Sequence, residues 1–109
     1  MACTEPFIAY LSDQLAAIEH LVIKPMFGEY GIWADGKFFA LICDDRLYIK
    51  PTAAGRQYIG PVTEAPPYNG AKNYFLIDEH LDDRQWLSQL VRITLAELPP
   101  PRPKKKTKT

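Results

Sequence analysis

The sequence predicts an α+β domain: an N-terminal helix, a three-stranded antiparallel meander, further strand structure and a C-terminal helix packed on one face. Three observations support this prediction. Apolar residues recur at helical spacing near both ends of the chain, and they alternate at strand spacing in the middle. Between two alternating runs stands Asp35-Gly36, a dipeptide that favours a tight hairpin turn. At 109 residues the chain has the length of one domain with one core.

The first helix is expected over residues 5–19. Thr4 is suited to cap it, and the first turn would contain Glu5 and Pro6, which are both favourable at that end. One side of this helix would carry the apolar residues Phe7, Leu11, Leu15 and Ile18. A helix of this length is not stable alone, so it must dock on another part of the protein. His20 would then stand at its C-terminus, where a histidine complements the helix dipole.

The meander is expected from the runs EYGIWA, KFFALIC and RLYIKP. Asp35-Gly36 joins the first two runs, Asp44-Asp45 joins the second and third, and Pro51 ends the last strand. If both turns have two-residue loops, residues that lie opposite each other share a face of the sheet. Gly31 is interpreted as a backbone device, marking a bulge or a close approach within the sheet.

Both faces of this meander are predicted to be mostly apolar. One face collects Trp33, Phe38, Ala40, Ile42, Leu47 and Ile49. The other collects Tyr30, Ile32, Phe39, Leu41, Cys43 and Tyr48, with Lys37, Arg46 and Lys50 at its rim. An antiparallel sheet in a small protein usually has one solvated face. We therefore expect the first face to pack on the helices and the second to be a homodimer or partner interface, formed by Tyr30, Ile32, Phe39, Leu41 and Tyr48.

The rest of the domain is less regular until the last helix. Residues 52–59 fit a short helix or a turn, residues 60–70 fit a loop that ends in an Asn-Gly turn, and residues 71–78 fit a fourth strand. Asp82 and Asp83 suit the start of the C-terminal helix, and Pro99 ends it. Its apolar stripe contains Leu87, Leu90, Val91, Thr94 and Leu98.

The charge distribution separates a domain at residues 1–100 from a basic tail at residues 101–109. The net charge is zero, but the last eight residues carry five basic groups and no acid, so the preceding part is acidic. Such a tail is too polar to order itself. It is either a solubilising end or a set of phosphate contacts, and the contacts would be Arg102, Lys104, Lys105, Lys106 and Lys108. Lysines beside the aromatic sheet face are a second candidate for nucleic-acid binding.

No catalytic, cofactor or metal site is predicted. Cys43 on a strand beside two aspartates lacks the cationic surroundings that activate a thiol, and it is interpreted as a core or interface residue. His80 lies among acidic residues but has no ligand partner at zinc spacing. A third hypothesis, an enzyme or ligand-binding protein, would need Cys43 or a pocket beside His80. The sequence shows no leader and no membrane span, and its two cysteines are interpreted as reduced thiols, so we expect a cytoplasmic protein.

An ordered set of short motifs resembles one family. The set comprises Met26-Phe27-Gly28, Tyr30-Gly31, Gly36, Phe39-Ala40-Leu41-Ile42, Leu47-Tyr48 and Lys50. At this spacing it resembles the N-terminal domain of TfoX/Sxy-type bacterial competence regulators, over roughly residues 22–98. Two departures stand out. Glu29 replaces the usual second glycine, and a basic tail stands where longer members carry a second domain.

The resemblance implies a secretion-chaperone-like α+β fold, in which homodimers are common. It also implies a regulator that assists another transcription regulator, and it brings no catalytic residue or cofactor. We therefore expect a homodimeric, non-enzymatic regulatory or adaptor domain acting through protein–protein contacts, with a transcription regulator as the possible partner. The alternative is an accessory protein that binds DNA nonspecifically through its basic C-terminal tail.

Overall fold

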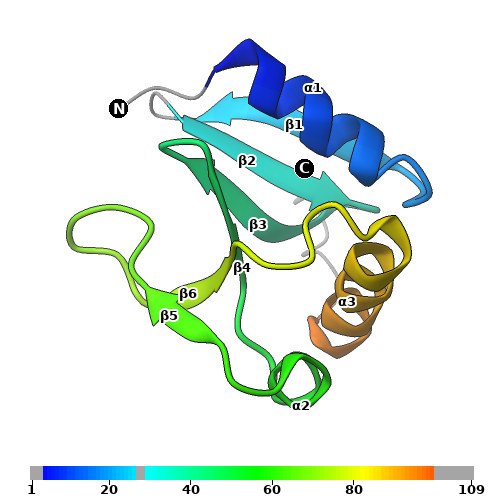
Figure 1. Ribbon diagram of the computed structural model, residues 1–109, viewed down its shortest axis with the longest axis vertical. Coiled ribbons are helices and arrows are strands. Elements are labelled where there is room, and N and C mark those ends of the chain that lie inside the picture. The colour runs from blue at the N-terminus through cyan, green and yellow to red at the C-terminus, as the bar shows by residue number, and fades with distance from the viewer. Residues whose placement is uncertain (1–3, 27–28, 100–109) are drawn as a thin grey trace, which may run out of the picture.

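The α+β prediction is confirmed by the computed structural model, which describes residues 4–26 and 29–99. The elements in order are α1 (Glu5–Gln14), β1 (Leu21–Met26), β2 (Glu29–Ala34), β3 (Lys37–Cys43), β4 (Arg46–Ile49), α2 (Ala53–Ile59), β5 (Thr63–Ala65), β6 (Tyr74–Ile77) and α3 (Arg84–Glu97). The strands form one six-stranded antiparallel sheet in the order β1-β2-β3-β4-β6-β5. Helices α1 and α3 lie on one side of it, and α2 packs against α3 (Figure 1).

Helix α1 begins as predicted but ends earlier. The Thr4 hydroxyl accepts a hydrogen bond from the amide of Phe7, which caps the first turn. After Gln14 the backbone changes to tighter turns, in which the amide of Ile18 donates to the carbonyl of Leu15. His20 then takes a positive φ of 58° and leads directly into β1. The expectation that His20 complements a helix C-terminus is therefore wrong.

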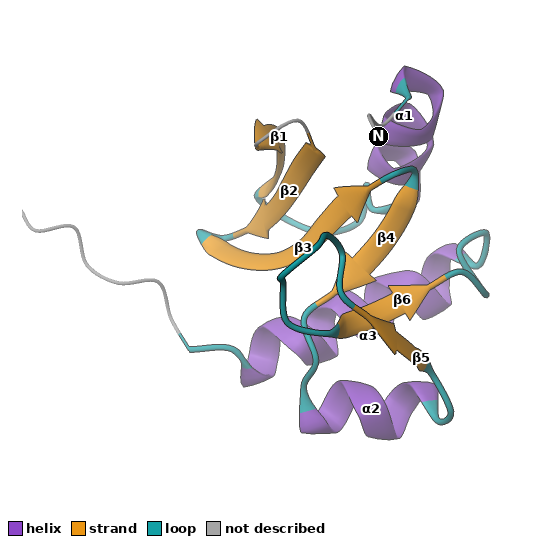
Figure 2. Ribbon diagram, turned by 90° about the vertical axis from the view of Figure 1, so that its left-hand side faces the viewer, coloured by secondary structure: helices purple, strands orange, loops and turns teal. Residues whose placement is uncertain are grey.

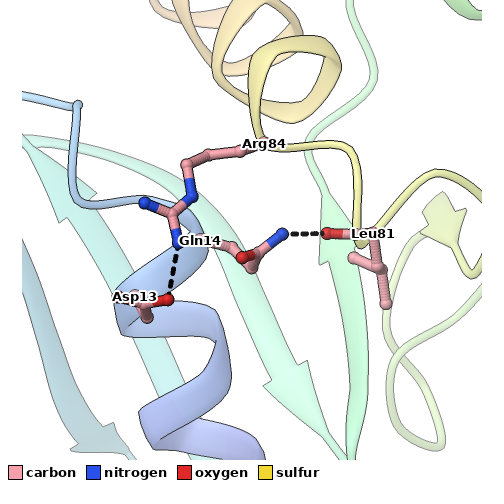
Figure 3. A network of polar contacts seen from close by, with 4 residues as sticks. All are labelled: Asp13, Gln14, Leu81 and Arg84. Atoms are coloured by element: carbon pink, nitrogen blue, oxygen red, sulfur yellow. Dashed lines mark hydrogen bonds and ion pairs between the residues drawn. The ribbon is translucent and has the colours of Figure 1, made fainter.

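Two polar contacts hold the end of α1 against the segment that precedes and begins α3 (Figure 3). The side-chain amide of Gln14 donates to the carbonyl of Leu81 at 2.8 Å, and the Arg84 guanidinium pairs with the Asp13 carboxylate at 2.7 Å. Gln14 is buried, so its hydrogen bond satisfies a group that would otherwise be costly to desolvate. The exposed Asp13–Arg84 pair contributes at most about 1 kcal/mol.

Strand β1, which contains Pro25, was not predicted from the sequence. It pairs with β2 at one edge of the sheet. The amide of Asp35 donates to the carbonyl of His20, and this pair sets the alternation of hydrogen bonds along the two strands. Hydrogen-bonded positions recur at every second residue after His20. Pro25 is five residues later, so it stands at a position without hydrogen bonds to β2, and its nitrogen faces away from that strand. A proline is tolerated there because it removes no bond from the sheet.

Both predicted two-residue turns are confirmed. Asp35 and Gly36 have φ of 54° and 80°, and Asp44 and Asp45 have φ of 56° and 57°. Positive φ at both central positions is the geometry that matches the twist of the flanking strands. The carboxylate of Asp45 also accepts hydrogen bonds from the amide and hydroxyl of Thr4, so the second turn anchors the start of α1.

A bulge between β2 and β3 makes the predicted division of the faces partly wrong. Trp33 lies opposite Phe38 and Ile32 lies opposite Ala40, which leaves Phe39 as an extra residue on β3. An extra residue reverses the inward and outward alternation on one side of the bulge. Consequently Ile32 and Phe39 face the helices, whereas Trp33 and Phe38 lie on the opposite face. Tyr30 also packs against the main core.

The main core lies between the sheet and the helices. Its buried members are Leu11, Leu15, Ile18, Ile32, Ala34, Phe39, Ala40, Ile42, Leu47, Ile49, Phe75, Ile77, Leu87, Leu90 and Val91. Ile32 and Phe39, which were predicted to form an interface, are 0% exposed in this core. That part of the predicted interface is therefore wrong.

The elements after the meander follow the prediction more closely. The expected short segment is helix α2, and Thr52 caps it by accepting from the amide of Gly55 at 3.0 Å. The expected fourth strand is β6, which pairs with β5 on one side and β4 on the other. Asp83 caps α3 by accepting from the amide of Trp86 at 3.1 Å, and Leu98 lies at its C-terminal cap.

Candidate functional site on the helix-free sheet face

The sheet face opposite the helices, here called the open face, is the candidate site. Its central residues Leu41, Cys43 and Tyr48 form a second apolar cluster. The loop between β5 and β6 projects on this side of the sheet (Figures 1 and 2). Exposure of these three side chains is only 2–5% in the single chain. The chain thus covers the centre of this face itself. The number of apolar residues on the face therefore does not require a second copy of the chain to cover them.

An apolar hollow lies at one end of the open face. It has a volume of about 280 Å³ and is lined by Met26, Glu29, Leu41, Cys43 and Tyr68. Tyr68 stands at its rim and is 55% exposed. The lining is mainly hydrocarbon and sulfur, with a carboxylate at one side. The hollow can therefore receive an apolar side chain.

Tyr74 packs beside this hollow, against the Leu41, Cys43 and Tyr48 cluster. Burial raises the pKa of the Tyr74 hydroxyl above its usual value, and the neighbouring Tyr68 and Cys43 raise it further. The direction of this shift follows from burial, which disfavours the ionised form of the hydroxyl.

The other end of the open face, beside the Asp35-Gly36 turn, carries a patch of Lys24, Trp33, Phe38 and Lys50. We call it the turn-end patch. The Trp33 and Phe38 rings are 5.2 Å apart between centroids and are tilted by 54°. The Lys24 ammonium lies 5.3 Å from the Trp33 ring, and the Lys50 ammonium lies 5.1 Å from the Phe38 ring. Both rings are partly exposed, so each can be reached from solvent.

Gly31 allows the Trp33 ring to lie against the sheet. A Cβ atom at Gly31 would stand 2.9 Å from two atoms of the Trp33 ring and 3.1 Å from the Phe38 ring. These distances are shorter than van der Waals contact. The prediction of a close approach at this glycine is confirmed, and the approaching group is an indole ring.

The three basic residues predicted at the rim separate in the structure. Lys50 belongs to the turn-end patch. Lys37 instead donates to the carbonyls of Leu95 and Leu98 at the C-terminal end of α3. Arg46 is exposed at the far end of the sheet, 4.0 Å from Asp44. Lys24 was missed because strand β1 was not predicted.

Some of the predicted residues lie outside the part of the chain that the structure describes. They are the tail residues Arg102, Lys104, Lys105, Lys106 and Lys108, and Phe27-Gly28 of the motif.

His80 and Cys43, which were considered as catalytic or ligand-binding residues, pack against other side chains of the domain. The His80 ring lies against the Trp86 ring at 4.7 Å between centroids and is tilted by 34°, and Cys43 is buried. Across residues 4–26 and 29–99, His, Cys, Asp and Glu side chains do not gather in threes as metal ligands would. In the same part of the chain, each helix is too short or too polar to cross a membrane.

The fold and this site define a small α+β domain with a helix-covered and a helix-free sheet face. The family model described as the TfoX N-terminal domain matches residues 13–98. The chain is also 37% identical over 110 residues to an uncharacterized 12.7 kDa protein in the trpE 5′ region of Spirochaeta aurantia, with 100% of this chain and 96% of that protein covered. The chain belongs to the TfoX N-terminal domain family, which is a regulatory and non-catalytic family.

Proposed function

We propose that this protein is a non-enzymatic regulatory adaptor of the competence-regulator type, which acts by contacting a transcription regulator. Family membership over residues 13–98 is the observation that carries the proposal. The apolar hollow supports it, because a pocket with an exposed tyrosine at its rim is a common anchor site in protein interfaces. The partner would insert an apolar side chain between Tyr68 and Met26.

The test compares gene expression in a bacterium that carries this gene. A deletion strain is complemented with the natural chain, with Tyr68→Asp or with Tyr10→Asp. Tyr68 and Tyr10 are both exposed, at 55% and 38%, and Tyr10 lies on α1 away from the hollow. The Tyr68→Asp strain should reproduce the transcript changes of the deletion, including those of DNA-uptake genes, while the Tyr10→Asp strain behaves as natural. A deletion that changes no transcripts would contradict a regulatory role.

Homodimerisation stays a prediction, and the hollow is the place to test it. Phe39 and Leu41 are buried, so an aspartate at either position would damage folding rather than report on an interface. Light scattering at tens of micromolar should instead give twice the chain mass for the natural protein. It should give the single chain mass for Tyr68→Asp. A natural chain that is monomeric at this concentration would rule the homodimer out.

The second candidate function is nonspecific DNA binding by the basic tail. The charge separation between the acidic domain and the tail favours it. Fluorescence anisotropy with a labelled duplex should show binding that weakens steeply with salt. Binding should disappear in a chain that ends at Pro101. Duplex binding that is unchanged without the tail would contradict this candidate.

A further inference from the structure

We propose that the turn-end patch of Lys24, Trp33, Phe38 and Lys50 is a binding site for single-stranded nucleic acid. The inference is independent of the proposed regulatory contact, which uses the apolar hollow at the other end of the open face. It also differs from tail binding, because its ligand contacts are aromatic rings on the folded sheet.

The geometry of the patch provides the first argument. Trp33 and Phe38 are cross-strand neighbours on β2 and β3, so their rings stand side by side on the helix-free face. Both rings are partly exposed. Gly31 leaves the space in which the Trp33 ring rests on the sheet. Two neighbouring aromatic rings on an antiparallel sheet can stack on successive unpaired bases.

The positions of the two lysines provide the second argument. Each ammonium lies within about 5.3 Å of one of the two rings; Lys24 comes from β1, and Lys50 directly follows β4. A stacked base would displace the ammonium from the ring, and a backbone phosphate beside that base would bind it. Lysine is depleted in the cores of protein–protein interfaces, so two lysines over the exposed rings disfavour a protein partner here. A nucleic acid carries both negative charges and planar bases, so it can contact all four side chains of the turn-end patch.

The preference for single strands follows from the same geometry. The rings lie on a sheet surface, where a base can stack only if it is free of its partner strand. A duplex offers phosphates to the lysines but keeps its bases stacked inside. The patch should therefore bind an unpaired oligonucleotide more tightly than the same sequence in a duplex.

The experiment uses Trp33 as its own probe in the full chain. The Trp86→Phe variant leaves Trp33 as the remaining tryptophan, and Trp86 itself packs between His80 and Tyr58. Titration with oligothymidylate should quench the Trp33 fluorescence, and a matched duplex should not. Anisotropy of the labelled oligonucleotide with the natural chain gives the same comparison without the substitution.

Two further variants separate stacking from general charge. Phe38→Leu keeps apolar volume but removes one ring, and should weaken binding about tenfold. Lys24→Ala should lower the salt slope of single-strand binding by about 0.7, whereas the matched control Arg92→Ala should leave it unchanged. Arg92 lies on α3, on the helix-covered side of the sheet.

Several outcomes in these assays would each overturn the proposal. They are the absence of Trp33 quenching, equal quenching of Trp33 by single strand and duplex, equal effects of the Lys24 and Arg92 variants, and full-strength binding by Phe38→Leu. Equal competition by polyglutamate would also overturn it, and would assign the patch to an acidic protein segment. Loss of the regulatory effect in Tyr68→Asp with intact oligonucleotide binding would leave this proposal standing.

Discussion

At the scale of single residues, Gly31 determines how the open face is built. Its lack of a side chain leaves room for the Trp33 ring, whose nearest atoms would be 2.9 Å from a Cβ atom. The ring in turn supports Phe38 and receives Lys24 on its outer side. The absence of a side chain at Gly31 therefore allows the two rings and the Lys24 ammonium to take these positions.

Gly31→Ala should push the Trp33 ring away from the sheet. We expect a loss of roughly 1 kcal/mol in the free energy of unfolding, because the added methyl group overpacks the contact with the ring. In the Trp86→Phe background the emission of Trp33 should shift to longer wavelength as the ring becomes more exposed. With Trp33→Phe instead, the remaining Trp86 should not respond to the same glycine substitution. An unshifted Trp33 spectrum would disprove this account.

Lys37 has a structural role that the sequence did not indicate. Its ammonium donates to the carbonyls of Leu95 and Leu98, at 2.9 and 3.3 Å. A cation at a helix C-terminus satisfies terminal carbonyls and complements the helix dipole. The tight turn between β2 and β3 is thereby tied to the end of α3.

Lys37→Met should destabilise the fold by about 1 kcal/mol, because it keeps the hydrocarbon stem but removes the charged donor. Urea unfolding followed by circular dichroism measures the change. Lys72→Met, in the exposed loop between β5 and β6, serves as control and should have little effect. Equal losses in the two variants would show that the contact with α3 contributes nothing.

At the scale of elements, α2 depends on α3 for its start. The Glu97 carboxylate accepts hydrogen bonds from the amides of Ala53 and Ala54, at 3.4 and 2.9 Å. The Thr52 hydroxyl accepts from Gly55 in the same turn. A seven-residue helix is too short to persist alone. Its formation therefore requires that α3 be in place.

Glu97→Ala should cost about 1 kcal/mol of stability, in the range of a lost helix cap. Hydrogen exchange should show faster opening of the α2 amides while the β3 amides stay protected. Glu79→Ala, which removes an exposed carboxylate outside any helix, is the matched control. Unchanged exchange in α2 would mean that Glu97 does not stabilise its first turn.

At the scale of the whole molecule, alkaline pH should destabilise the fold through two partly buried tyrosines, Tyr58 and Tyr74. Burial raises the pKa of Tyr74, and burial together with the nearby Asp83 raises the pKa of Tyr58. In the unfolded chain both tyrosines ionise near their usual pKa of about 10. Above that pH the unfolded state loses protons that the folded state still holds, so stability falls as pH rises toward the folded pKa.

The contribution of these two tyrosines to the free energy of unfolding should therefore be constant below about pH 9 and decline above about pH 10. Tyr74→Phe removes one of the two groups, so its decline should be shallower than that of the natural chain. Urea unfolding at several pH values measures both slopes. Parallel curves for the two proteins would show that Tyr74 titrates alike in the folded and unfolded states.

Local sequence determined most of the elements of this protein and its family. The α+β class, both tight turns, the strands of the meander, the caps at Thr4 and Asp83, and the TfoX-type motifs all follow from residues that act on their neighbours. Periodicity and turn chemistry are short-range properties, and they can be read without knowing what lies across the sheet.

Only the tertiary structure decided which side chains share a face. The bulge at Phe39 forms between two strands, and it moved Ile32 and Phe39 into the core and Trp33 and Phe38 out of it. Strand β1 forms because it pairs with β2, and this pairing places Lys24 in the turn-end patch. Pairing register is a property of two strands together, so the alternation within either strand alone could not determine it.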